Sequence, residues 1–347
     1  MLFHMEKQYK DCLTKTPITE LLNTAFLIRK RHFGNQVTIH IINNAQNGHC
    51  PEDCSYCAQA KTADSKIETY GLKPAEEMLE EATRAYEQGA HRYCMVLSGR
   101  GPTPTKINQI TDVIRTIKRK HPDKEVCLSA GLLNDGMAVA LQQAGLDRLN
   151  HNINTSEDNY AEICTTHTYM DRINTLNSAQ KAGLSLCSGV IVGMGESHDE
   201  LIAMALKLKS LNVRSIPINF LIPVPGTPFE NCNTLTPEFC LRVLCLFRLI
   251  NPDAEIRMAA GREYHLRSLQ VMGLYPANSL FMDGYLNTVG TQQFETLKMI
   301  QDAGFEIESN KTVDALLAEL GAETTEKSVP LKTKDALRPV QTQLNAH

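Results

Sequence analysis

Residues 36–57 read QVTIHIINNAQNGHCPEDCSYC, an apolar β-branched run that leads directly into a loop with three cysteines. The run predicts a strand over Gln36–Ala45, and the periodic segment before it predicts a helix over Pro17–Phe33. The loop therefore follows the carboxyl end of the first strand. In an α/β barrel, the carboxyl ends of the strands carry the chemistry.

Further apolar runs alternate with amphipathic helical segments along the rest of the chain. Gly89, Gly145, Gly183 and Gly304 each follow a helical pattern, where a left-handed residue ends a helix. Strand–helix–strand steps make right-handed parallel crossovers, and eight in succession predict a (β/α)8 TIM-type barrel of the α/β class. The expected strands are Gln36–Ala45, His91–Ser98, Glu125–Leu132, Arg148–Asn154, Leu184–Val192, Ser215–Pro223, Glu255–Ala260 and Ser279–Leu286.

We expect three parts along the 347 residues. They are an N-terminal helical extension over 1–35, the barrel over 36–305, and a partly disordered C-terminal extension over 306–347. The tail from Glu323 to His347 is polar and lacks periodicity, so it is predicted to be mobile.

Composition restricts the class of protein. With 42% hydrophobic and 21% charged residues the chain can bury a large core, and a net charge of −4 argues against a nucleic-acid partner. The most apolar stretches, such as Leu184–Met194, are too short to span a bilayer, and no signal peptide is recognisable. Eleven cysteines without dense, even spacing favour ligands or core residues in a reducing cytoplasm. We therefore expect a cytoplasmic enzyme with no membrane partner.

The three loop cysteines are Cys50, Cys54 and Cys57, with C-x3-C-x2-C spacing. Three thiolates on one short loop can hold three irons of a cubane [4Fe–4S] cluster and leave the fourth iron open. An open iron suits a cluster that binds and cleaves a small molecule. A zinc knuckle or a disulfide loop is the alternative, because His49 stands beside Cys50.

The loop, with Tyr56 directly before the third cysteine, resembles the radical S-adenosylmethionine (SAM) enzymes. Further phrases resemble the biotin synthase family, over roughly Ile39 to Gly304. These phrases are Pro51-Glu52-Asp53-Cys54, Val126-Cys127-Leu128-Ser129, Asn150-His151-Asn152, Cys187-Ser188-Gly189 and Arg257-Met258-Ala259-Ala260-Gly261-Arg262-Glu263.

This resemblance implies a second cluster, a [2Fe–2S] centre deep in the barrel, with Cys94, Cys127, Cys187 and Arg257 as its ligands. Taken singly, each of these cysteines is more typical of plain core, because free cysteine is often buried as a small hydrophobe. An arginine ligand is unusual, since guanidinium is a pure donor. Arg257 can instead pair with a buried carboxylate. No role is expected for Cys164, Cys232, Cys240, Cys245 or Cys12, which precedes the first predicted helix.

The resemblance also implies SAM-binding residues. Asn150, Asn152 and Asn154 alternate along a predicted strand and so share one face, where buried amides need a ligand or a partner. Asn152 is implied between SAM and substrate, and Asn154 at the ribose hydroxyls, where some relatives have Asp.

Three more residues are implied at SAM. Tyr56 precedes the third loop cysteine, and Arg172 is expected near the SAM carboxylate. Ile191 lies in the glycine-rich run over residues 189–196, which resembles the strand that flanks adenine. Such a run lets a ligand approach the backbone closely.

The implied substrate is dethiobiotin, with Asn152, Asn219 and Thr288 as its contacts. The Asn219 carboxamide suits a cyclic urea, because both carry a carbonyl acceptor and N–H donors. The implied reaction is insertion of one sulfur between two unactivated carbons, the last step of biotin biosynthesis. A flavodoxin with its reductase as electron donor and a homodimer are also implied.

Three alternatives stay open from the sequence. A hydrogenase-cofactor maturase or a methylornithine-forming mutase would need the cubane but not the strand cysteines with Arg257. A non-catalytic iron–sulfur or zinc protein would leave the row Asn150–Asn154 and the glycine-rich run without a purpose.

Overall fold

The computed structural model describes residues 2–321, and the predicted mobile tail from Glu323 to His347 lies outside them. Ten strands form one parallel sheet, ordered β10-β1-β2-β3-β4-β5-β7-β8-β9, with β6 beside β7 and β1 paired to β9. The strands are β1 Gln36–Gln46, β2 Arg92–Leu97, β3 Glu125–Ser129, β4 Arg148–Asn150, β5 Ser185–Cys187, β6 Val190–Val192, β7 Ser215–Phe220, β8 Glu255–Met258, β9 Ser279–Met282 and β10 Glu306–Ile307.

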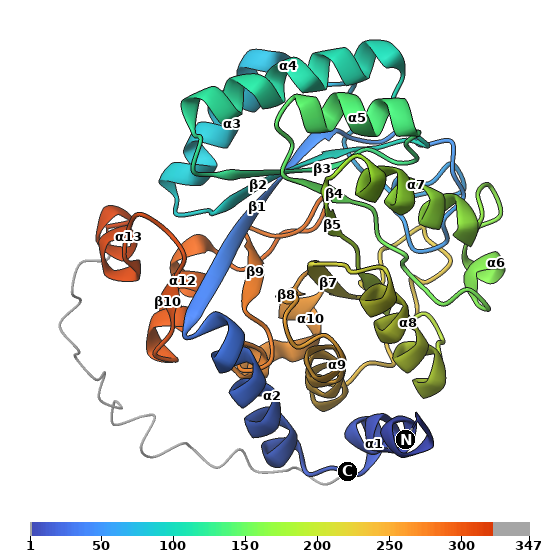
Figure 1. Ribbon diagram of the computed structural model, residues 1–347, viewed down its shortest axis with the longest axis vertical. Helices are drawn as coiled ribbons and strands as arrows, with labels where there is room; N and C mark the ends of the chain where they lie inside the picture. Colours follow the sequence, from blue (N-terminus) through green and yellow to red (C-terminus); the bar gives the residue numbers. More distant parts are fainter. Residues whose placement is uncertain (1, 322–347) are drawn as a thin grey trace, which may run out of the picture.

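The β1–β9 pairing closes the sheet into the predicted barrel, around which the helices lie (Figure 1). The helices are α1 Leu2–Thr14, α2 Ile18–Phe33, α3 Ala75–Glu87, α4 Pro104–Lys120, α5 Asp135–Gln143, α6 Tyr160–Ile163, α7 Tyr169–Lys181, α8 His198–Ser210, α9 Pro237–Ile250, α10 Arg262–Leu266, η1 Arg267–Leu269, α11 Gln270–Gly273, α12 Gln293–Asp302 and α13 Val313–Glu319.

All eight predicted strands are present, but the fifth is broken in two. β5 ends at Cys187 and β6 begins at Val190, and between them the chain presses against β7. A Cβ on Gly189 would lie 1.8 Å from the carbonyl oxygen of Pro217, so only glycine fits this crossing. The four helix-ending glycines predicted from the sequence have φ between +72° and +92°.

Helix starts follow local side-chain chemistry. Thr168 and Ser197 are the N-caps of α7 and α8, and each forms a capping box. In each box the hydroxyl accepts from the N–H of the third helical residue, and the carboxylate of that residue accepts from the backbone N–H of the cap. Thr103 and Thr236 cap α4 and α9, each with proline at the first helical position. These caps direct each helix across the outside of the barrel after its strand.

Elements at both ends of the described chain were not predicted. Cys12 does not precede the first helix but lies inside α1, where it is buried with Tyr9 and Leu13. The spacing of these three residues is helical, so the sequence carried a signal. β10 pairs with the start of β1, and α13 packs against α12. Across residues 2–321, no helix is long and apolar enough to cross a membrane.

Candidate active site

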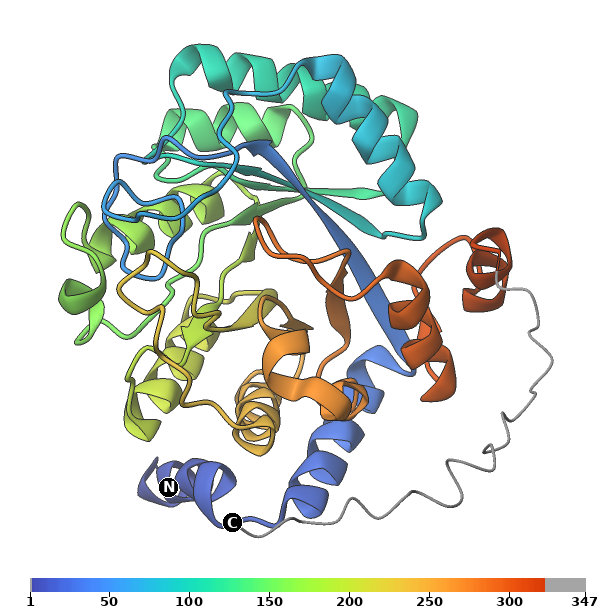
Figure 2. The same ribbon diagram turned by 180° about the vertical axis from the view of Figure 1, so that it is seen from behind.

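A cavity of about 300 Å³ opens at the carboxyl ends of the strands, where the fold predicts the chemistry. The loop of residues 47–74 lines part of it. This loop runs beside the α6 segment and the loop of residues 221–236 (Figure 2). Ten residues predicted at the cubane, SAM and substrate all line the cavity: Cys50, Cys54, Tyr56, Cys57, Asn152, Asn154, Arg172, Ile191, Asn219 and Thr288.

The cluster loop, residues 50–57, presents its three thiols to one wall of this cavity. The amide of Cys57 donates to the carbonyl of Cys54 at 3.0 Å, which folds the loop into a tight turn. Burial raises the pKa of Cys50 and of Cys57, so both are neutral thiols in this structure. Iron would replace these protons. Three thiols on one short loop beside an open cavity fit a cubane with one iron facing a ligand.

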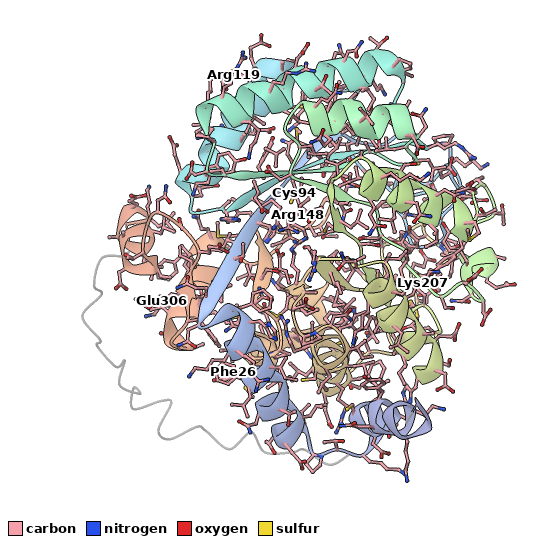
Figure 3. The ribbon with its side chains drawn as sticks, in the orientation of Figure 1. Phe26, Cys94, Arg119, Arg148, Lys207 and Glu306 are labelled. Atoms are coloured by element: carbon pink, nitrogen blue, oxygen red, sulfur yellow. The ribbon has the colours of Figure 1, made fainter. Side chains whose placement is uncertain are left out.

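A second group of sulfurs lies deeper, in the strands. The strand thiols Cys94, Cys127 and Cys187 are buried together with Ala259 and Phe281. Cys94 lies near the centre of the barrel, whereas Arg119 and Lys207 project from the outer helices (Figure 3). The β2–β3 register sets Cys94 opposite Cys127, and contact with the Cys127 thiol raises the pKa of Cys187.

Arg257 points toward this group from β8. Its Nη1 lies 3.8 Å from the sulfur of Cys187, and its Nε is buried without a hydrogen-bond partner. Its Nη2 pairs with Glu255 at 2.5 Å and donates to Ser215 at 2.6 Å. The ion pair with a buried carboxylate, which the sequence left open for Arg257, is therefore present. The three strand thiols, with one Arg257 nitrogen that has no hydrogen-bond partner, also fit a small metal cluster.

The asparagine row connects the two thiol sets. β4 ends at Asn150, so the predicted strand to Asn154 is too long, because Asn154 takes a left-handed φ of +66°. All three amides nevertheless line the cavity. Asn150 donates from Nδ2 to Cys187 at 3.2 Å and to Oδ1 of Asn152 at 3.2 Å.

Two family models match the chain: the Radical SAM superfamily over residues 47–208, and the Biotin and Thiamin Synthesis associated domain over residues 217–306. The biotin synthase of Magnetococcus marinus is 54% identical over 288 residues, which cover 83% of this chain and 89% of that protein. The chain belongs to the biotin synthase family. It is a radical SAM enzyme, a class that implies a [4Fe–4S] cluster and SAM.

Other relatives agree with this assignment. The biotin synthase of Leptospira interrogans is 54% identical over 83% of this chain and 82% of that protein, and that of Bacillus licheniformis is 48% identical over 86% and 89%. Among solved structures, methylornithine synthase superimposes with a TM-score of 0.73 at 17% identity, covering 91% of this chain and 96% of that chain. The FeFe-hydrogenase maturase of Carboxydothermus hydrogenoformans gives 0.74 at 17%, covering 88% and 76%. These two likenesses confirm the barrel.

In this family member, Arg172 is not an ordinary surface residue of its helix. It is buried against the cavity, and its Nη1 donates to the carbonyl of Asn152 at 3.0 Å. Its Nη2 lies 2.9 Å from Nε2 of His167. Because a guanidinium can only donate, Nε2 must accept, and the proton sits on Nδ1 of His167. That Nδ1 donates to Glu52 at 2.6 Å.

The chain Glu52–His167–Arg172 therefore ties the cluster loop to the part of the cavity that Arg172 lines. Burial raises the pKa of Glu52, but hydrogen bonds from Thr166 and His167 outweigh it and hold the pKa below its usual value. Glu52 belongs to a motif that the sequence shows, but no role was predicted for it or for His167. Their contact joins two loops 115 residues apart, which the sequence does not reveal.

The glycine-rich run over residues 189–196 reaches the cavity at one residue. Ile191 lines the cavity, but the amides of Gly193 and Met194 both donate to the carboxylate of Glu196, at 2.6 and 2.8 Å. Those two amides are therefore occupied rather than free for a ligand edge. Asn154 contacts the Tyr56 hydroxyl through its Nδ2.

Of the three residues predicted at the substrate, Asn219 and Thr288 line the cavity together with Asn152. Asn219 donates to the carbonyl of Val190 at 2.9 Å and accepts from the amide of Ala260 at 3.2 Å. Each end of its carboxamide keeps one further hydrogen-bonding position. The Thr288 hydroxyl donates to the carbonyl of Tyr285 at 2.7 Å, in the loop after β9.

Proposed function

We propose that this chain inserts one sulfur atom between two unactivated carbons of dethiobiotin and so forms biotin. The observation that carries the proposal is that one thiol set lines the cavity and a second thiol set contacts a residue of its lining. The cluster loop lines the cavity wall, and Asn150 joins that cavity to Cys187 among the strand thiols. The relatives named above are biotin synthases matched over most of their length, which supports the same reaction.

Each donor set suits one cluster. The cluster loop would hold a [4Fe–4S] cluster, and the strand thiols with Arg257 would hold a [2Fe–2S] cluster. When bound, the first cluster with SAM supplies the radical chemistry at the substrate carbons and the second supplies the sulfur. The protein contributes orientation and the exclusion of water.

The cavity residues would orient SAM and substrate. Arg172 faces the cavity with its guanidinium held by His167 and Tyr160, and a fixed guanidinium suits the SAM carboxylate. Asn152 and Asn154 would meet SAM from the asparagine row. Asn219, held by two backbone groups, would offer its remaining donor and acceptor to the cyclic urea.

Partners and location follow from the family as proposals. We expect a homodimer, a flavodoxin with its reductase as the electron source, and a cytoplasmic setting. The eleven cysteines are all free, and thiols that hold iron need a reducing compartment. No nucleic acid is expected.

Iron and acid-labile sulfide analysis after anaerobic reconstitution tests the proposal. One [4Fe–4S] and one [2Fe–2S] cluster per chain are expected. Cys54→Ala should abolish the cubane and SAM cleavage while it spares the smaller cluster, because the two sets lie on separate elements. Cys127→Ala should do the reverse: biotin formation is lost and some reductive SAM cleavage persists.

Two results would contradict the proposal. SAM cleavage by Cys54→Ala would end the radical role of the cluster loop. If Cys127→Ala forms biotin at the wild-type level, the strand thiols are ordinary core residues. That result would favour the alternative of a maturase or a mutase, which does not need them.

A further inference from the structure

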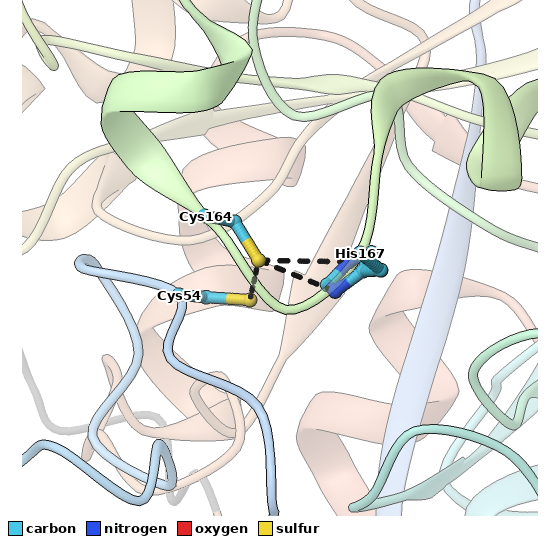
Figure 4. A group of neighbouring side chains, drawn as sticks. All are labelled: Cys54, Cys164 and His167. Atoms are coloured by element: carbon cyan, nitrogen blue, oxygen red, sulfur yellow. Dashed lines mark hydrogen bonds between the residues drawn. The ribbon is translucent and has the colours of Figure 1, made fainter.

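Cys164 has no place in either cluster, yet its sulfur lies 3.6 Å from the sulfur of the cluster ligand Cys54 (Figure 4). Cys164 ends α6 and Cys54 lies in the loop after β1, so the barrel brings together two residues 110 positions apart. Both side chains are buried, with exposures of 8% for Cys54 and 4% for Cys164. In the described part of the chain, no sulfur–sulfur hydrogen bond involves Cys50 or Cys57.

The two loops that carry this pair are held firmly together. Asp53 accepts from the amides of Thr165 and Thr166, at 3.0 and 3.2 Å, and lies 3.3 Å from the Cys164 sulfur. The amide and hydroxyl of Ser55 donate to the carbonyl of Ile163 at 3.0 and 3.1 Å. These contacts fix the two sulfurs at close range.

His167 lies beside the pair and completes a group that resembles a zinc site. The hydrogen bonds argue against that use. Nε2 accepts from Arg172 and the Nδ1 proton points to Glu52, so neither nitrogen offers a free lone pair. The group is therefore a dithiol with a histidine neighbour.

We propose that Cys164 is a resolving thiol for Cys54 in the cluster-free protein, so that the two form a reversible disulfide under oxidation by peroxide. The inference rests on the proposed role of Cys54 as a cubane ligand, because only cluster loss frees its sulfur. A disulfide at Cys54 excludes iron from that position. Cluster loading then depends on prior reduction.

The chemistry balances with hydrogen peroxide as the oxidant. Cys54 lines the cavity, whereas Cys164 does not, so the peroxide meets Cys54 first. The Cys54 thiol donates toward the Cys164 sulfur, so its proton leaves in that direction as the Cys54 sulfur attacks peroxide. The O–O bond breaks, and the released hydroxide takes up the proton, so that a sulfenic acid and one water form. The Cys164 sulfur then attacks that sulfur, the S–O bond breaks, and a second water leaves. Two thiols and one peroxide thus give one disulfide and two waters.

The benefit is protection of a ligand that the enzyme needs. An unresolved sulfenic acid oxidises further to sulfinic and sulfonic acids, which thiol reductants do not reverse. A disulfide is restored by a dithiol through exchange. The sulfurs must approach from 3.6 Å to about 2.05 Å, a shift that small movements of the two loops supply.

The test uses the full-length protein, stripped of iron by a chelator under anaerobic conditions and then treated with hydrogen peroxide. Peptide mass spectrometry without reduction should find Cys54 linked to Cys164. After dithiothreitol treatment and reconstitution with iron and sulfide, the cubane absorption should return. In Cys164→Ser, the cross-link should be absent, Cys54 should be found as sulfinic acid, and most of the cubane absorption should be lost.

Two controls make the result specific. Cys12→Ser removes a thiol from α1, away from both thiol sets, and should behave as wild type. Cys164→Ala repeats the test in case serine disturbs folding, which circular dichroism checks. Equal over-oxidation of Cys54 in wild type and in both Cys164 variants overturns the inference, as does a link from Cys54 to Cys50 or Cys57. If untreated wild type fails to take up a cubane, the proposed function fails, while the peptide analysis still reports on the disulfide.

Discussion

At the scale of a single residue, Arg257 contacts both the strand thiols and a buried carboxylate. One side of its guanidinium faces the strand thiols, and the other forms an ion pair with Glu255. Burial lowers the pKa of Arg257, but Glu255 outweighs burial and raises it, so the side chain is charged here. A metal ligand needs a lone pair, so Arg257 would have to give up a proton to iron before it could complete the [2Fe–2S] ligand set. The Arg257–Glu255 contact would therefore influence any cluster bound beside it.

Arg257→Ala should leave biotin formation measurable, because water or thiol can occupy the vacated site. It should also alter the visible absorption and the redox behaviour of the [2Fe–2S] cluster, since ligand charge and hydrogen bonding set cluster potential. Arg262→Ala is the matched control, because Arg262 is equally buried but pairs with Glu263. The control should lower the thermal midpoint and leave the spectrum unchanged. An unchanged spectrum in Arg257→Ala would reduce Arg257 to an ion-pair partner.

Asn154 offers a second prediction for one residue. Its left-handed φ suits Asn and Asp alike, and its Nδ2 contacts the Tyr56 hydroxyl. In Asn154→Asp the carboxylate accepts from Tyr56 instead, so the SAM dissociation constant should change by less than tenfold, about 1 kcal/mol. Asn154→Ala should weaken SAM binding more, because alanine can hydrogen-bond neither to the Tyr56 hydroxyl nor to SAM. Equal affinities in all three proteins would place Asn154 away from SAM. Equilibrium dialysis with anaerobic protein measures these constants.

At the scale of elements, the break between β5 and β6 positions the site. Cys187 ends β5 at the strand thiols, and β6 begins at Val190 and brings Ile191 to the cavity. The amide of Gly189 donates to Oδ1 of Asn152 at 2.9 Å, which orients that amide. The close crossing over Pro217 makes this geometry possible.

Gly189→Ala should therefore lower the free energy of unfolding by about 3 kcal/mol. The new Cβ would collide with the carbonyl of Pro217, and the packed strands around it leave no room for the backbone to move away. Gly136→Ala is the control: that position lies in the first turn of α5, with no atom closer than 3.5 Å to the new Cβ. Alanine there should be neutral or stabilising by up to about 1 kcal/mol. Urea unfolding measures both, and a Gly189→Ala midpoint equal to wild type would refute the steric argument.

At the scale of the whole molecule, buried ion pairs link strands around the barrel interior. Glu255 of β8 forms an ion pair with Arg92 of β2 at 3.0 Å. It also lies 3.0 Å from Nε2 of His40 of β1, and because burial lowers the pKa of His40, this contact is a hydrogen bond from a neutral imidazole. Arg92 and Arg148 of β4 then share Glu125 of β3, at 2.5 and 3.0 Å. Strands far apart in sequence are thereby joined beneath the strand thiols.

This network predicts how stability depends on pH. Burial raises the pKa of Glu125, but Arg92 and Arg148 outweigh burial and lower it from 4.5 to about 2. A lowered folded-state pKa contributes stability above pH 4.5 that is lost as pH falls toward 2. Glu125→Gln should therefore lose less stability over this window than wild type, by on the order of 2 kcal/mol after solvent screening.

Glu80→Gln, on the exposed surface of α3, is the control and should follow wild type. Urea unfolding of cluster-free protein at several pH values between 2 and 5 separates the variants. Parallel pH curves for wild type and Glu125→Gln would show that the network adds nothing to acid stability.

The sequence by itself determined the barrel, its strand order and the place of the cluster loop. These follow from local patterns: apolar runs, helical periods, helix-ending glycines and cysteine spacing repeat within a few residues. The strand thiols and cavity residues were found through resemblance, since no local rule assigns Cys94 or Arg257 to a metal.

Only the tertiary structure decided contacts that depend on barrel closure. Cys54 meets Cys164, and Glu52 meets His167, because two loops more than 100 residues apart fold over one strand end. The break at Gly189 was equally hidden, because it depends on how closely β7 approaches. Such contacts depend on which side chains the closed barrel brings within a few ångströms, and sequence spacing does not encode that distance.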